Sequence, residues 1–170
     1  MSPDDRSRRR KNPPRRSSLP PQARTRPSPT DAHEVVYFQR HVEDHPAQTK
    51  PGRDALRSFP AAVRAKMAAV LTAVAAAPPH RFSGGGYWEA MHGDMTGYYE
   101  VRADGPGRHH YRLFCFLDYD AIHPDHDKPL LVVLTGLDKP FRTTFSDADY
   151  AEVRALGEEY RGRNDPRPLG

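Results

Sequence analysis

Three strand-like segments stand close together in the second half of the chain, and they constrain the fold more than any other feature of the sequence. Residues 97–102, 110–118 and 130–137 are rich in aromatic and β-branched side chains, and turn-forming or polar segments separate them. Short connections favour antiparallel pairing of consecutive strands. The three segments therefore predict an antiparallel meander. Because the third segment is apolar on both faces, we expect it to be the central strand of the sheet.

The segment before the meander predicts one strand and one long helix. Residues 35–38 form a short β-rich run, and residues 41–54 are polar and contain proline and glycine, which is typical of a loop. Apolar side chains then recur over residues 59–74 with the spacing of one helical face. We expect Ser58 to cap this helix and the prolines at 78–79 to end it.

A second helix is expected near the end of the chain. Ser146 and Asp149 have the spacing of a capping box, with Asp in place of the preferred Glu or Gln, and apolar residues follow at helical spacing as far as Tyr160. The sequence therefore predicts an α+β fold, in which an N-terminal strand and helix are followed by the meander and a C-terminal helix.

Charge and proline divide the chain into a tail and a body. Residues 1–30 hold nine Lys/Arg, two Asp and seven Pro, which gives them a net charge of +7; since the whole chain is +4, residues 31–170 carry −3. We expect residues 1–33 to be disordered, residues 34–162 to form one domain and residues 163–170 to form a second disordered tail. The basic tail fits an arm attracted to nucleic acid, a solvated linker, or translation from a start codon placed too far upstream. The acidic body excludes a uniformly basic nucleic-acid-binding domain.

Several other classes of protein are excluded by what the sequence lacks. A single cysteine, Cys115, excludes an intramolecular disulfide framework and a multi-cysteine zinc site. The longest nearly unbroken apolar run, residues 67–77, is far shorter than the ~20 residues of a membrane span. The N-terminus lacks the apolar region of a secretory signal. We therefore expect a cytoplasmic protein without a membrane partner.

The sequence also gives no sign of a metal or a cofactor. His41 and His45, and the histidines within residues 123–127, have neither the fixed spacing nor the helical context of metal ligands. The three glycines at 84–86 are not followed by the Lys-Ser/Thr of a phosphate-binding loop. We predict neither a metal site nor a small-molecule cofactor.

Three short motifs resemble the RelE/ParE superfamily of bacterial toxins, and most closely its HigB-like, phage-derived branch. They are GYYEVR at 97–102, HYRLF at 110–114 and LTGLDK at 134–139, and they occur in the order found in that branch, before a C-terminal helix. The chain departs from the family pattern where Lys139-Pro140 replaces a pair of lysines and Thr135-Gly136-Leu137 replaces His-Gly-Phe.

The resemblance implies a RelE-like fold and the toxin of a type II toxin–antitoxin system. Such a toxin is an endoribonuclease that cleaves mRNA, commonly on the ribosome, and a neighbouring antitoxin protein inhibits it. Two alternatives stay open. A ParE-like protein would inhibit DNA gyrase without cleaving anything, and a degenerate member would serve only as a binding domain.

RNA cleavage without a metal can use the 2′-hydroxyl as nucleophile, and it needs a base, an acid and cations beside the phosphorane. Strand alternation puts Arg102 and Arg112 on one face of the sheet. The resemblance implies that these two catalytic residues together bind the phosphate. Alternatively, they are surface residues that form salt bridges to Glu100 and Asp118. Lys139 stands where the family keeps a catalytic cation, and its alternative is a loop lysine paired with a neighbouring aspartate.

Three further residues are candidates for binding RNA. Tyr98 shares a predicted face with Arg102 and could stack on a base, while Tyr99 is expected in the core. Arg142 could replace the missing second lysine. His92 could reach the same face of the sheet, or it could simply be solvated. Glu100 could act as a base, or form a salt bridge to one of the arginines.

Overall fold

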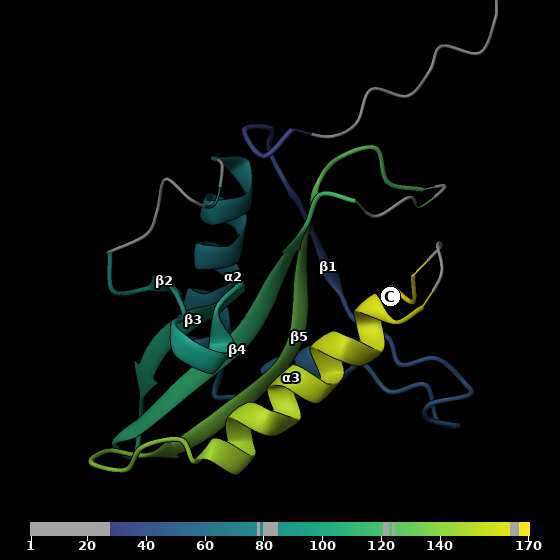
Figure 1. Ribbon diagram of the computed structural model, residues 1–170. Helices are drawn as coiled ribbons and strands as arrows, with labels where there is room; N and C mark the ends of the chain where they lie inside the picture. The colour runs from purple at the N-terminus through teal and green to yellow at the C-terminus, as the bar shows by residue number, and fades with distance from the viewer. Residues whose placement is uncertain (1–27, 78, 80–84, 121–122, 124, 164–166) are drawn as a thin grey trace, which may run out of the picture.

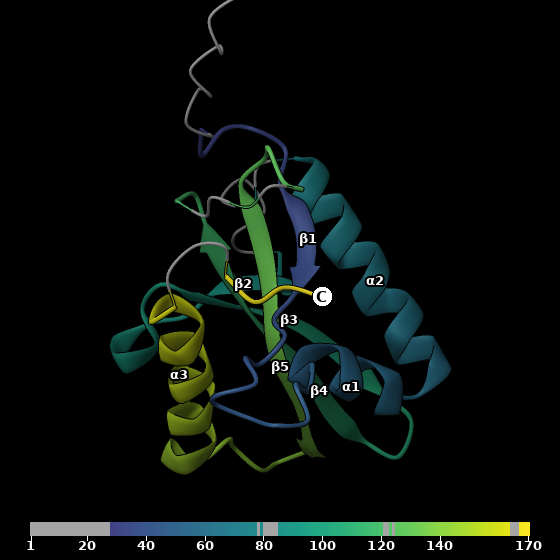
Figure 2. The same cartoon turned by 90° about the vertical axis from the view of Figure 1, so that its right-hand side faces the viewer.

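The computed structural model describes residues 28–77, 79, 85–120, 123, 125–163 and 167–170. A five-stranded mixed sheet forms the middle layer, with α1 and α2 on one face and α3 on the other (Figures 1 and 2). In chain order the elements are β1 (Glu34–Tyr37), α1 (Pro51–Ser58), α2 (Ala61–Ala76), β2 (Trp88–Ala90), the 3-10 turn η2 (Gly93–Met95), β3 (Tyr98–Gly105), β4 (His109–Asp118), β5 (Leu130–Pro140) and α3 (Asp147–Arg161).

The strands lie in the order β1-β5-β4-β3-β2, and the predicted α+β class is confirmed. The three strands of the expected meander pair in antiparallel fashion, β3 with β4 and β4 with β5. β1 pairs in parallel with β5, so β5 has a strand on each side. Its first five side chains, residues 130–134, are fully buried because helices cover both faces of the sheet. The central position nevertheless belongs to β4, so the expectation that the third segment is the central strand is wrong.

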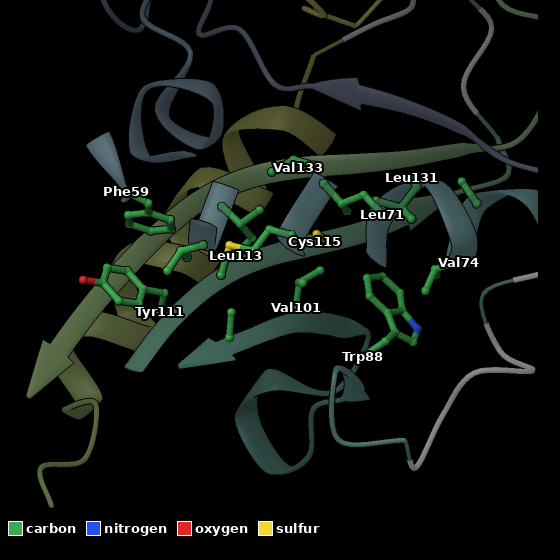
Figure 3. Packing of buried hydrophobic residues seen from close by; sticks show 14 of the residues in the cluster. Phe59, Leu71, Val74, Trp88, Val101, Tyr111, Leu113, Cys115, Leu131 and Val133 are labelled. Atoms are coloured by element: carbon green, nitrogen blue, oxygen red, sulfur yellow. The ribbon is translucent and has the colours of Figure 1, made fainter. Parts of the chain in front are cut away.

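Each face of the sheet has its own apolar core. The core between the sheet and α1 and α2 is shown in Figure 3, where Trp88 and Val101 lie on the same side of the sheet as Leu71 and Val74 of α2. Cys115 belongs to this core, and burial raises the pKa of its thiol. The second core, which includes Phe114 of β4 and Val153 of α3, lies between the sheet and α3.

The structure differs from the sequence-based prediction before and inside the meander. Helix α1 lies within the segment expected to be mostly loop. It was missed because Pro51 and Gly52 at its start are typical of a loop. In the structure Gly52 is buried against β5, where an added Cβ would lie 2.9 Å from the carbonyl oxygen of Val133. Ser58 ends α1 instead of capping α2, whose N-cap position is Pro60. The short edge strand β2 was also not predicted.

The ends of the domain are more ordered than the sequence suggested. Residues 1–27 of the predicted N-terminal tail lie outside the described residues, but His33 is buried and its backbone N–H donates to Ala75. At the other end, Leu169 forms a bridge with Phe38. Arg167 donates to the buried carboxylate of Asp118 at 3.2 Å. The expected C-terminal tail therefore packs on the domain at residues 167–170, through contacts distant in sequence.

The capping box predicted at the start of α3 is confirmed. The side chain of Ser146 accepts from the backbone N–H of Asp149, and the Asp149 carboxylate accepts from the backbone N–H of Ser146 at 2.7 Å. The latter hydrogen bond is the main reason that the pKa of Asp149 is lowered from its ordinary value of 3.8.

Replacing Ser146 with Ala should lower the free energy of unfolding by about 1 kcal/mol, because one N-terminal amide of α3 loses its acceptor. Urea unfolding at neutral pH measures this change.

The lowered pKa of Asp149 makes the stability of the fold depend on pH. A carboxylate whose pKa is lower in the folded than in the unfolded protein stabilises the fold at pH values above its unfolded pKa. This contribution is lost as the pH falls through its folded pKa. Urea unfolding at neutral pH and near pH ~3 should therefore show that Asp149→Asn removes part of the acid sensitivity of the wild type. Equal acid sensitivity in the two proteins would contradict this account.

Candidate functional site

Two arginines and a glutamate form a cluster on the sheet face that carries α3. Arg102 of β3 and Arg112 of β4 lie directly opposite each other in the antiparallel register, so their side chains leave the sheet on the same face. The carboxylate of Glu100 joins them. It accepts from Arg102 Nε at 2.6 Å and also contacts Arg102 Nη2, and its second oxygen lies 3.8 Å from Arg112 Nε. We call these three residues the Glu100 cluster.

Burial differs strongly within the Glu100 cluster. The side chain of Glu100 is 8% exposed and that of Arg112 is 16% exposed, whereas that of Arg102 is 42% exposed. Burial lowers the pKa of Arg112, and the adjacent Glu100 carboxylate opposes this effect. A guanidinium titrates so high that Arg112 nevertheless keeps its charge. Two cations and one anion leave the cluster positive, with Arg102 as its most accessible cation.

A groove of about 480 Å³ opens beside the Glu100 cluster, between η2, β3 and the start of α3. Its polar lining carries both signs of charge and comes from three parts of the chain: His92 and Asp94 before and in η2, Glu100 and Arg102 on the sheet, and Asp147, Tyr150 and Arg154 on α3. The structure thus brings two of the predicted residues, His92 and Arg102, to one groove. Arg112 does not line the groove and is linked to it through Glu100.

Tyr150 and Arg154 were missed as candidate site residues. In the sequence, Tyr150 belongs to the apolar periodicity of the last helix, and it does pack against Phe114 at 6.2 Å between ring centroids. Burial, followed by the charge of Glu100, raises the pKa of the Tyr150 phenol. The spacing of Tyr150 and Arg154, one helical turn apart, was the only available signal, and it does not show which face of the sheet α3 covers.

The structure does not bring Lys139 into this groove. Lys139 was expected just after the third strand, but β5 continues to Pro140 and pairs Lys139 with His110. Its ammonium group lies 3.6 Å from the centroid of the Phe145 ring. Arg142 is exposed in the loop after β5 and likewise does not line the groove.

Tyr98 lies on the expected face, but α3 covers it. The side chain is buried, and its hydroxyl lies 3.5 Å from the carbonyl oxygen of Arg154. An added Cβ at Gly157 would meet the Tyr98 ring, so the helix approaches closely because it has glycine there. The prediction that Tyr98 stacks on a base therefore does not fit this structure. Tyr99, expected in the core, is partly buried and stacks on Trp88.

The alternative partner expected for the arginines is engaged elsewhere. Asp118 accepts from the Tyr160 hydroxyl at 2.8 Å and from Arg167. Within the described residues, the ion pairs of Arg102 and Arg112 are with Glu100. His126 pairs with Glu34 at 2.7 Å. The described part of the chain holds no group of three or more His, Cys, Asp or Glu side chains suited to a metal ion.

None of the helices in the described residues is long and apolar enough to cross a membrane. Comparison of the sequence and the fold with protein-family models, with curated proteins and with solved structures found no match. The interpretation of this site therefore rests on its own geometry and on the motifs of β3, β4 and β5.

Proposed function

We propose that this chain is a metal-free endoribonuclease with a RelE-like fold, the toxin of a toxin–antitoxin pair that cleaves mRNA in the cytoplasm. The observation that carries the proposal is the facing register of Arg102 and Arg112 beside an open groove. Part of the element order also supports it, since an N-terminal strand, a long helix, an antiparallel meander and a C-terminal helix follow one another as the resemblance implies, while helix α1 and strand β2 are additions to that pattern.

In this proposal the Glu100 cluster binds the scissile phosphate. Arg102 donates to the non-bridging oxygens, and Arg112 adds a second, partly desolvated positive charge behind it. The negative charge on these oxygens grows as the phosphorane forms, so donors fixed beside them favour the transition state over the ground state. Glu100 is a positioning residue, because it is buried and holds both guanidinium groups.

The groove also supplies candidates for proton transfer. His92 takes the proton of the 2′-hydroxyl while the 2′-oxygen forms a bond to phosphorus. The bond from phosphorus to the 5′-oxygen breaks, and the Tyr150 phenol, which its raised pKa keeps protonated, donates a proton to that oxygen. The products are a 2′,3′-cyclic phosphate and a 5′-hydroxyl, and exchange with water then restores both side chains.

Two observations favour the second candidate, a binding protein of the same fold that inhibits DNA gyrase or only binds a partner. Glu100 already neutralises part of the positive charge that a phosphate would meet. Lys139, the cation that the resemblance places in the catalytic set, is held against Phe145 outside the groove.

The experiment that separates the candidates uses the purified full chain with mRNA, in the presence and absence of ribosomes, and with gyrase in a parallel supercoiling assay. We expect mRNA cleavage and unaffected supercoiling. Inhibited supercoiling with intact mRNA would replace the proposal by the ParE-like function. No effect in either assay would leave a binding domain.

A further inference from the structure

Tyr87 is an exposed aromatic residue that the proposed chemistry does not use. It is 52% exposed, and the only other large hydrophobic residue of comparable exposure in the described part of the chain is Val42. Tyr87 comes immediately before β2, and its carbonyl oxygen accepts from the backbone N–H of Arg102 at 2.9 Å. This hydrogen bond fixes the tyrosine beside the most exposed cation of the Glu100 cluster.

A second cavity connects Tyr87 with both arginines. It measures about 240 Å³, and its lining includes Lys66 of α2, Tyr87 and both arginines. Asp104 also lines it, and its carboxylate is paired with His110. Strand β2 is short and pairs with β3 only as far as Val101. Beyond this residue β2 does not cover the outer edge of β3, and the cavity opens there. Pockets that bind drug-sized ligands measure roughly 300–1,000 Å³. This cavity is smaller, so it suits one planar group such as a single base.

Lys66 gives this cavity an additional positive charge. Its ammonium group lies 4.7 Å from the centroid of the Tyr87 ring. Within the part of the chain that the structure describes, Lys66 forms no ion pair with a carboxylate. An exposed aromatic ring beside basic side chains is the combination with which proteins bind single-stranded nucleic acid, because the ring stacks on a base and the cations contact the phosphates.

We propose that Tyr87 and Lys66 form a subsite for one base of single-stranded RNA, next to the phosphate held by the Glu100 cluster. The inference rests on the proposed function and adds a place for one unpaired base of its substrate. Arg102 lines both cavities, so they adjoin each other at the outer edge of β3, and a nucleotide next to the scissile phosphate reaches Tyr87 around this edge. A base-paired strand cannot offer a free ring face, so duplex RNA is excluded from this subsite.

The test measures binding without cleavage, with a short fluorescein-labelled 2′-O-methyl RNA strand that has no 2′-hydroxyl nucleophile. Tyr87→Leu should raise the Kd about 10-fold, Tyr87→Phe should leave it close to wild type, and Lys66→Met should raise it by a smaller factor that shrinks at high salt. The matched control is Val42→Ala, which changes the other exposed hydrophobic residue and should not alter the Kd.

A series of oligonucleotides, each lacking the base at one position, distinguishes stacking of a base on Tyr87 from a purely structural role of this residue. Removal of the stacked base should weaken binding to wild type and have no further effect on Tyr87→Leu. If the strand binds wild type and Tyr87→Leu equally well while mRNA is still cleaved, the subsite is wrong and the proposed function stands. If wild type neither binds the strand nor cleaves mRNA, both are wrong.

Discussion

Replacing Arg102 with Ala should lower the rate of RNA cleavage about 10²- to 10³-fold, the effect of removing one donor that stabilises a developing oxyanion. Arg102 is the most exposed member of the Glu100 cluster, so it is the guanidinium that a phosphate meets first. The fold should survive, since Arg112 still lies beside the Glu100 carboxylate. Single-turnover cleavage of a defined RNA, with circular dichroism as a check of folding, measures both effects.

The matched control is Arg57→Ala, because Arg57 is an exposed arginine at the end of α1, on the opposite face of the sheet. It should cleave at the wild-type rate. Wild-type cleavage by the folded Arg102→Ala variant would place the chemistry elsewhere in the molecule, and Lys139 and Arg142 would then be the next residues to test.

Replacing Glu100 with Ala should lower the free energy of unfolding by about 3 kcal/mol, because it leaves the partly buried guanidinium of Arg112 without its counter-charge. The expectation follows from the low exposure of both side chains. Urea unfolding at neutral pH measures the loss. The double variant Glu100→Met with Arg112→Met should recover most of this stability, since it removes both buried charges together.

Asp104→Ala is the control for this measurement. Asp104 lies on the same strand and pairs with His110 at 2.6 Å, but its side chain is 60% exposed. An exposed pair contributes little, so the free energy of unfolding should change by less than ~1 kcal/mol. A loss at Glu100 no larger than the loss at Asp104 would show that Glu100 does not hold the cluster together.

Local alternation was enough to predict where the two arginines point. Residues of one strand that are two apart share a face, and directly opposite residues in antiparallel strands share it too. The Gly and Pro turn between β3 and β4 brings Arg102 opposite Arg112. The same argument correctly predicted the face of Tyr98, but it could not show that α3 covers that part of the face.

The rest of the site depends on contacts that no local pattern specifies. Lys139 was misplaced because β5 keeps its pairing with β4 as far as Pro140, beyond the apolar run that identifies the strand in the sequence. Tyr150 and Arg154 enter the groove only because α3 docks across the sheet where Gly157 admits Tyr98. Helix α1 was missed for a similar reason, since Pro51 and Gly52 at its start are typical of a loop, and the contacts of Gly52 and Ala55 with β5 join residues distant in sequence.

The chemical ends of the RNA products test the central claim most directly. Cleavage by the 2′-hydroxyl leaves a 2′,3′-cyclic phosphate and a 5′-hydroxyl, and it needs no added metal. The account predicts these ends when purified full-length protein cleaves mRNA, in the presence of EDTA if the reaction needs no ribosomes. Products with a 3′-hydroxyl and a 5′-phosphate would contradict it, because a water molecule, and not the 2′-oxygen, would then be the nucleophile.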